Sequence, residues 1–342
     1  MNKIAYKKYS IWIIFFIFIS YSFFSLGYSN IKIKTSDLKL LDDDAYIYRD
    51  IAENGVSDYY FDHRSSRILV PGIAHGISKI NILGQKFNTP GANIFFVSTV
   101  LCFLSLICLF RLGELYFDKK TAILATFLFM ISFSTSNYMF MGYPDSAEFL
   151  LSTLLFICLS KKKYWYILPI YFLAAFNRES FILFSLPLLF VWCIFLIEKK
   201  ERLKFIIISS ISATLFMLIL MIIKILLQET TSTFSNQFFS WISFDKFFMY
   251  VSSDHIRMFL YPMLFLLPMG LMGSKDNKKL FYSIATICFI YFFVGGLFIG
   301  SGAAVGRYLF SSAGPLLLIS QSFFLIKIYN YYNEINNPNS MS

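Results

Sequence analysis

The run ANIFFVSTVLCFLSLICLFRL, residues 92–112, holds one charged residue, Arg111, in 21 positions. Its length matches the ~20 residues that an α-helix needs to cross the hydrocarbon core of a bilayer. Apolar runs of similar character recur along the chain. We therefore predict an all-α, polytopic transmembrane helix bundle of about ten spans, over residues 9–27, 92–112, 121–141, 145–160, 164–177, 180–197, 205–227, 257–273, 281–300 and 308–326.

The composition excludes an ordinary soluble domain. The 342 residues are 57% hydrophobic and 20% aromatic, and only 15% are charged, whereas soluble domains are nearer a quarter charged. The net charge of +10 would otherwise indicate nucleic acid, but most basic residues lie in short segments between apolar runs. The predicted partner is therefore the lipid bilayer and not nucleic acid. The five cysteines lie inside apolar runs and show no metal-binding spacing.

The distribution of charge predicts the topology. Ten crossings place both termini on one side of the membrane. That side carries six of the twenty acidic residues. It also carries seventeen basic residues in short segments, namely Lys3, Lys7, Lys8, Arg111, Lys119, Lys120, Lys161, Lys162, Lys163, Lys199, Lys200, Arg202, Lys204, Lys275, Lys278, Lys279 and Lys327. The positive-inside rule makes this side cytoplasmic, so both termini are predicted to be inside.

The chain is predicted to be one integral membrane domain, residues 1–342, with two long outer loops at 28–91 and 228–256. The first loop contains SRILVPGIAHGISKINILG, residues 66–84, an apolar segment interrupted by proline and glycine. We interpret it as an interfacial or re-entrant helix, because a further span there would place the later basic clusters outside. FNRES, residues 176–180, is predicted as an outer turn between two short spans.

The first loop also carries DDDAYIYRDIAENG, residues 42–55. Leu41, Ala45, Tyr48 and Ala52 form one apolar stripe at helical spacing, and Asn54–Gly55 is a stop signal. One aspartate would serve as a helix cap. Three are more than a cap requires, and paired carboxylates are the usual groups for acid–base catalysis.

Carboxylates and arginines are predicted to converge on this outer face from separate places in the chain: His63, Arg64 and Arg67; Asp145 and Glu148; Arg178 and Glu179; and Arg307. Charges at membrane depth usually face a protein interior or a wet cavity, and arginine suits phosphate recognition. Each of these groups also has an interpretation in which it only stabilises the structure. Arg67 and Arg307 could snorkel to headgroups, Arg178 and Glu179 could simply neutralise charge in the turn, and Asp145 could cap its helix.

In order, DDDAYIYRDIA, RILVP, GYPDSAEF, AAFNRES and GRYLFSSAGPLL resemble the GT-C superfamily of membrane glycosyltransferases. The resemblance covers nearly the whole chain. It implies a GT-C-like bundle that transfers a sugar from a polyprenyl-phosphate-linked donor to a glycan or lipid-linked acceptor on the outer face of the membrane. The low-GC character of the composition and this resemblance together favour a bacterial inner membrane.

The resemblance implies residue roles. Asp44 would be the catalytic base, Asp43 or Asp42 its partner, and Asp145 the second acidic residue. Arg307 would lie near the lipid phosphate, and the other predicted substrate-binding residues are His63, Arg67, Arg178, Glu179 and Tyr308. No cofactor is required by this pattern. A divalent cation on the three aspartates stays an open alternative, and no metal ligand is assigned.

Three other interpretations stay open. An O-antigen or capsule repeat-unit polymerase also has about ten spans, but its arginines would be expected in later, larger loops. A transporter or lipid flippase is favoured by the broken hairpin over 164–197, but the predicted spans carry almost no ionisable groups at mid-depth. A scaffold protein without chemistry is equally compatible with acidic residues on one face.

Overall fold

A computed structural model describes residues 43–56, 67–79, 92–132, 134–135, 139, 143–226, 265–290 and 302–336. Within these ranges every regular element is helical, which confirms the predicted all-α class. The predicted first span, 9–27, and the second long outer loop, 228–256, lie outside the described residues. So do parts of the spans predicted over 257–273 and 281–300 and the loop segments 57–66 and 80–91.

The helices follow one another along the chain as α2 (Asp43–Asn54), α3 (Leu69–Ser78), α4 (Ala92–Tyr116), α5 (Lys119–Ile131), α6 (Asp145–Ser160), η3 (Tyr164–Tyr166), α7 (Ile167–Ala175), α8 (Ser180–Val191), η4 (Trp192–Leu196), α9 (Lys199–Leu226), α13 (Leu267–Ser274), α14 (Lys278–Ile290), α16 (Gly302–Ser312) and α17 (Gly314–Asn336). The helices predicted within 42–55 and 66–84 are confirmed as α2 and α3.

Two of these helices are long and apolar enough to cross a membrane, Asn93–Tyr116 and Lys199–Leu226. A third span is added if the bent pair α16–α17 counts as one. α9 exposes large apolar side chains along its length, including Leu203, Ile207, Met217 and Met221. Such a continuous apolar face fits contact with lipid rather than with water.

Two predicted spans are not single straight helices. The helix predicted over 121–141 ends at Ile131, because Ser132 is extended and the hydroxyl of Thr135 donates to the carbonyl of Phe129 at 2.6 Å. Serine and threonine hydroxyls compete in this way with helical hydrogen bonds. The span predicted over 308–326 is bent by 83° between Gly306–Ser312 and Gly314–Ile335.

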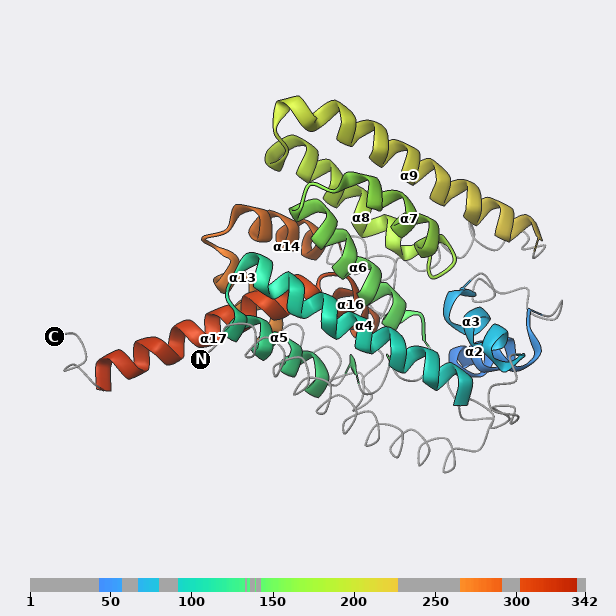
Figure 1. The fold of residues 1–342 in the computed structure, drawn as a ribbon, viewed down its shortest axis with the longest axis horizontal. Coiled ribbons are helices and arrows are strands. Elements are labelled where there is room, and N and C mark those ends of the chain that lie inside the picture. The colour runs from blue at the N-terminus through green and yellow to red at the C-terminus, as the bar shows by residue number, and fades with distance from the viewer. Residues whose placement is uncertain are drawn as a thin grey trace, which may run out of the picture.

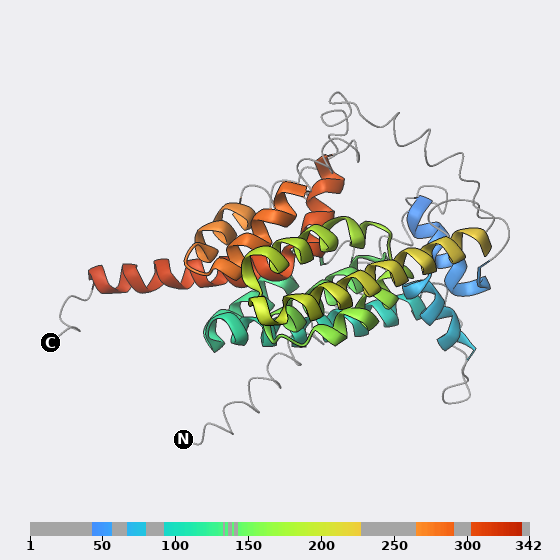
Figure 2. The same ribbon diagram turned by 90° about the horizontal axis from the view of Figure 1, so that it is seen from above.

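The helices form a bundle in which α4 lies between α5 and α6 (Figure 1). α17 packs against α13 and α5, α7 packs against α9, and α14 packs against α8. α16 packs against α6. α2 and α3 lie at one end of the bundle, and the C-terminal part of α17 projects from the opposite end in both views (Figures 1 and 2).

Close helix contacts depend on small residues. A Cβ atom built on Gly273 of α13 would lie 1.9 Å from the carbonyl oxygen of Ser320 on α17. One on Gly113 of α4 would lie 2.7 Å from the Cα atom of Ala122 on α5. Because any larger side chain would force these pairs apart, glycine sets their separation. The core between the helices is otherwise apolar, with Phe129, Phe149, Leu317 and their neighbours fully buried.

Candidate functional site

The site begins at the N-terminus of α6, where GYPDSAEF leaves an irregular segment and enters a helix. Pro144 immediately precedes the helix, a position that proline tolerates because its missing N–H has no helical partner there. Asp145 and Glu148 follow in the first turn, where a carboxylate interacts favourably with the helix dipole. Both side chains are buried, so their charges require partners inside the protein.

Arg178 supplies one partner from the turn between α7 and α8. It donates from Nη1 to Glu148 Oε2 at 2.9 Å and from Nη2 to Asp145 Oδ2 at 3.4 Å. The turn is held over α6 by Asn177, whose amide donates to the carbonyl oxygen of Pro144 at 3.0 Å. The guanidinium is therefore positioned by backbone contacts as well as by its carboxylate partners.

Arg307 of α16 supplies the second partner. Its Nε and Nη2 donate to Asp145 Oδ1 and Oδ2 at 2.9 and 2.5 Å, a bidentate pair. The Arg307 guanidinium lies 4.4 Å from the ring centroid of Tyr143, and the Arg178 guanidinium lies 4.6 Å from that of Tyr308. These cation–π contacts hold the planar groups between aromatic rings.

A second ion pair connects the first outer loop to the same turn. Arg67, just before α3, donates from Nη2 and Nε to Glu179 at 2.6 and 3.3 Å, and from Nη1 to the Tyr48 hydroxyl of α2 at 3.2 Å. The backbone N–H of Leu69 donates to the carbonyl oxygen of Phe176 at 2.8 Å. α2, α3 and the α7–α8 turn are thereby joined around Arg67.

The six ionisable residues, Arg67, Asp145, Glu148, Arg178, Glu179 and Arg307, form what we call the charge cluster. It contains three arginines and three carboxylates, so its net charge is zero when all are ionised. Removing one member would leave a buried charge unpaired, which is strongly destabilising. Within the described residues, Glu148 Oε1 and Arg178 Nε are buried without a hydrogen-bond partner.

Glu179 stays ionised at neutral pH. Burial on its own would raise its pKa, but the nearby Arg67 guanidinium outweighs that effect and lowers the pKa of Glu179 to about 2. The link between the first outer loop and the α7–α8 turn is therefore an ion pair throughout the physiological range.

The structure brings together six of the predicted site residues, Arg67, Asp145, Arg178, Glu179, Arg307 and Tyr308. The structural alternatives for five of them are wrong. Arg67 and Arg307 pair with carboxylates instead of snorkelling. Arg178 pairs with Asp145 and Glu148 of α6, and Glu179 pairs with Arg67, so the two do not merely neutralise charge within the turn. Asp145 is the first residue of its helix and not its cap.

The predicted catalytic aspartates are located only by their backbone. Asp43 and Asp44 lie in the first turn of α2, and Asp44 is one helical turn before Tyr48. Their side chains lie outside the described part of the structure, as do Asp42 and His63. Because Tyr48 is buried and hydrogen-bonded to Arg67, the helix that carries these aspartates is docked beside the charge cluster.

Sequence reasoning missed the polar roles of Tyr48 and Tyr143. It placed Tyr48 only in an apolar stripe, whereas its hydroxyl accepts from Arg67 and its ring meets Tyr143 edge-on, with centroids 6.0 Å apart. The presence of tyrosine rather than leucine in that stripe was the available signal, since a buried tyrosine hydroxyl usually has a partner.

The described residues contain no group of three or more His, Cys, Asp or Glu side chains that could hold a metal ion. No known protein family, curated protein or solved structure matches the chain. The case for a function therefore depends on the geometry and chemistry of the site itself.

Proposed function

We propose that this protein is a GT-C-like membrane glycosyltransferase of about ten spans in a bacterial inner membrane. It transfers a sugar from a polyprenyl-phosphate-linked donor to a glycan or lipid-linked acceptor on the outer face. The observation that supports this proposal is the charge cluster, in which the first outer loop, α6, the α7–α8 turn and α16 place charged side chains in contact.

Arg307 is the best-placed residue to meet the donor phosphate. Its side chain is 12% exposed, against 1% for Arg178 and 7% for Arg67. Its two bonds to Asp145 fix the plane of the guanidinium before a ligand arrives, which lowers the entropy cost of binding. Tyr308, which is partly exposed beside the Arg178 guanidinium, offers an aromatic side chain against which a sugar ring can pack.

Asp145 orients the arginines in this proposal and does not act as the base, because guanidinium donors already occupy both of its oxygens. The base is Asp44, with Asp43 as its neighbour. Asp44 takes the proton of the acceptor hydroxyl, and the acceptor oxygen forms a bond to the anomeric carbon. The bond from that carbon to the phosphate oxygen breaks, and the lipid phosphate leaves with the electron pair.

The docking of α2 gives Arg67 and Glu179 a positioning role. Arg67 holds Tyr48, one turn after Asp44, and Glu179 holds Arg67. A base on a loop helix needs such support, since a displacement of about 1 Å can cost ~10²-fold in rate.

The test is sugar transfer by the purified protein, assayed with a panel of radiolabelled polyprenyl-phosphate sugars. Asp44→Asn removes the proposed base and should lower transfer at least ~10²-fold, with unchanged yield and melting temperature. The matched control is Asp50→Asn in the same helix, since the one hydrogen bond of the Asp50 side chain to the described residues comes from Asn54. Transfer by Asp44→Asn at the wild-type rate would remove Asp44 from this role.

A transporter or lipid flippase is the second candidate, and the bend between α16 and α17 supports it. Arg307 lies on α16, beside an 83° break, and interrupted helices often form transport sites. Substrate movement across sealed vesicles without formation of a glycosidic bond would favour this candidate. A repeat-unit polymerase would be recognised by use of a diphosphate-linked oligosaccharide in place of a single sugar.

A further inference from the structure

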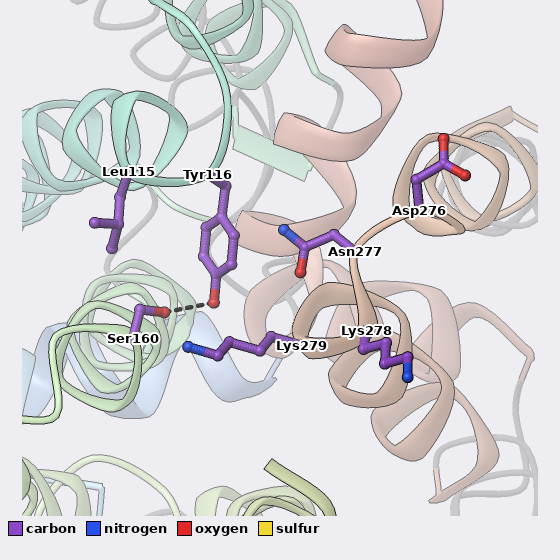
Figure 3. Close-up of a pocket in the computed structure, with 7 residues that line it drawn as sticks. All are labelled: Leu115, Tyr116, Ser160, Asp276, Asn277, Lys278 and Lys279. Carbon is purple, nitrogen blue, oxygen red and sulfur yellow. Dashed lines mark hydrogen bonds between the residues drawn. The ribbon is translucent and has the colours of Figure 1, made fainter. Parts of the chain in front are cut away.

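A second polar site lies at the opposite end of α6 from Asp145. A cavity of about 430 Å³ opens between the C-terminal ends of α4 and α6 and the turn that connects α13 with α14. Its lining residues are Leu115, Tyr116, Ser160, Asp276, Asn277, Lys278 and Lys279 (Figure 3). α6 has 16 residues, so about 24 Å of helix separates this cavity from the charge cluster.

The cavity joins positive charge to hydroxyl groups. Figure 3 shows Lys279 and Asn277 extending toward Tyr116 and Ser160, whose hydroxyls are hydrogen-bonded to each other. Lys278 also lines the cavity, but its amino group points away from the hydroxyl pair in Figure 3. Neither lysine forms an ion pair within the described residues. Lys279 lies 5.9 Å from the Trp192 ring centroid.

The acidic residue of the lining does not neutralise this charge. Asp276 is paired with Lys327 of α17 at 3.2 Å, and its carboxylate points away from the hydroxyl pair in Figure 3. The cavity therefore retains the positive charge of Lys278 and Lys279.

The lysines also lie at an unfavourable place in their helix. Lys278 and Lys279 are the first residues of α14, and no acidic residue occupies its first turn. The N-terminal end of a helix carries partial positive charge and normally favours acids. α9 also begins with two lysines, but Glu201 accompanies them in the first turn. At α14 the Asn277 side chain accepts from the Leu280 N–H at 3.3 Å, and an anion in the cavity would add negative charge to this neutral cap.

We propose that this cavity binds a phosphate group, carried by a ligand the size of a lipid headgroup. Lys279 and Lys278 supply the charge, Asn277 and the hydroxyl pair supply hydrogen bonds, and the helix dipole adds to the attraction. Basic pockets between spanning helices on the cytoplasmic side are known to bind anionic headgroups. The predicted topology places this end of α6 on that side.

The experiment is native mass spectrometry of the purified full chain, titrated separately with dioleoyl phosphatidylglycerol, with dioleoyl phosphatidylcholine and with inorganic phosphate. The double variant Lys278→Gln/Lys279→Gln should lower the affinity for phosphatidylglycerol about tenfold. The matched control, Lys199→Gln/Lys200→Gln, removes the same charge from the first turn of α9 and should change the affinity less than ~2-fold.

Comparison of the three titrations identifies whether the phosphate belongs to a lipid headgroup or to a soluble ligand. Lysine-dependent binding of phosphatidylglycerol but not of inorganic phosphate identifies a lipid headgroup, and lysine-dependent binding of inorganic phosphate identifies a soluble ligand. Equal loss of affinity in both double variants, or none in either, overturns the proposal. Should Lys278→Gln/Lys279→Gln not fold, Tyr116→Phe provides the test. It removes one hydroxyl and should weaken binding about threefold, and unchanged binding by that variant rejects the site.

Discussion

Asp145 accepts hydrogen bonds from two guanidinium groups that lie 33 and 162 residues later in the sequence. Its two oxygens are shared between the α7–α8 turn and α16, and Glu148 receives the remaining bond of Arg178. At this scale the cluster is a network in which Asp145, Glu148 and Arg178 are buried from solvent, so these three depend on protein partners to compensate their charge.

This arrangement predicts strong non-additivity. Asp145→Asn and Arg307→Gln should each destabilise the protein by about 3–5 kcal/mol, because each removes a bidentate ion pair from a largely buried site and leaves Asp145 or Arg307 with weaker charge compensation. The double variant should lose clearly less than the sum. Chemical or thermal unfolding of the purified protein in detergent measures all three. Additive losses would mean that the two side chains do not interact in solution.

The pH dependence of the Arg67–Glu179 link follows from the lowered pKa of Glu179. A carboxyl whose folded pKa is about 2, against about 4.5 when unfolded, contributes stability above pH ~4.5 and loses it as the pH falls toward 2. The difference in melting temperature between wild type and Glu179→Gln should therefore stay constant between pH 8 and pH 5. A difference that shrinks across that range would contradict the ion pair.

At the scale of residues, the sequence indicated which charged side chains lie near one another, but not which of them form ion pairs. The ends of the apolar runs showed which charges share a face, as with Asp145 and Arg307. Partner choice depends on how a short turn orients adjacent residues, and the neighbours Arg178 and Glu179 point to different partners. The sequence holds no periodic signal for that orientation.

At the scale of elements, helix existence was easier to predict than helix continuity. α2 ends at Asn54, where Gly55 adopts a φ of +83°, as the Asn–Gly signal predicts. The interruption after Ile131 depends on hydroxyl groups that bond back to the chain. Serine and threonine are only weakly polar on hydropathy scales, so the hydropathy of residues 121–141 did not reveal the break at Ser132 and Thr135.

The contact between α13 and α17 gives a prediction for an element. Gly273→Ala places a methyl group 1.9 Å from the Ser320 carbonyl oxygen, so the helices must separate, at a cost of about 1–3 kcal/mol. Gly72→Ala in α3 is the matched control. It meets no atom within 4 Å and should be neutral or stabilising by ~0.5–1 kcal/mol. Melting temperatures of the two variants provide the comparison.

At the scale of the molecule, the two polar sites lie at opposite ends of the bundle. The charge cluster lies beside α2 and α3, and the lysine-lined cavity lies near the projecting part of α17 (Figure 1). This separation agrees with a chain that presents one end to each side of a membrane. The number of crossings stays a prediction, because two to three apolar spans are seen in the described residues.

The two-sided arrangement predicts a labelling pattern. In a chain whose five native cysteines are replaced by alanine or serine, Glu53→Cys in α2 should react with an impermeant maleimide in intact cells. Lys200→Cys in α9 should react only after permeabilisation. Both parent residues are exposed, so access to water is not limiting. Labelling of both from the same side would remove the predicted topology, and the glycosyltransferase proposal with it.

The neutral charge cluster has a consequence for how the chain is made. Asp145 and Glu148 leave the ribosome before either arginine that neutralises them, and Arg307 follows Asp145 by 162 residues. Asp145 and Glu148 gain their first arginine partner only when Arg178 has been synthesised, and the bidentate pair of Asp145 forms only after α16. A chain that ends before α16 therefore has three carboxylates but only two arginines in this cluster.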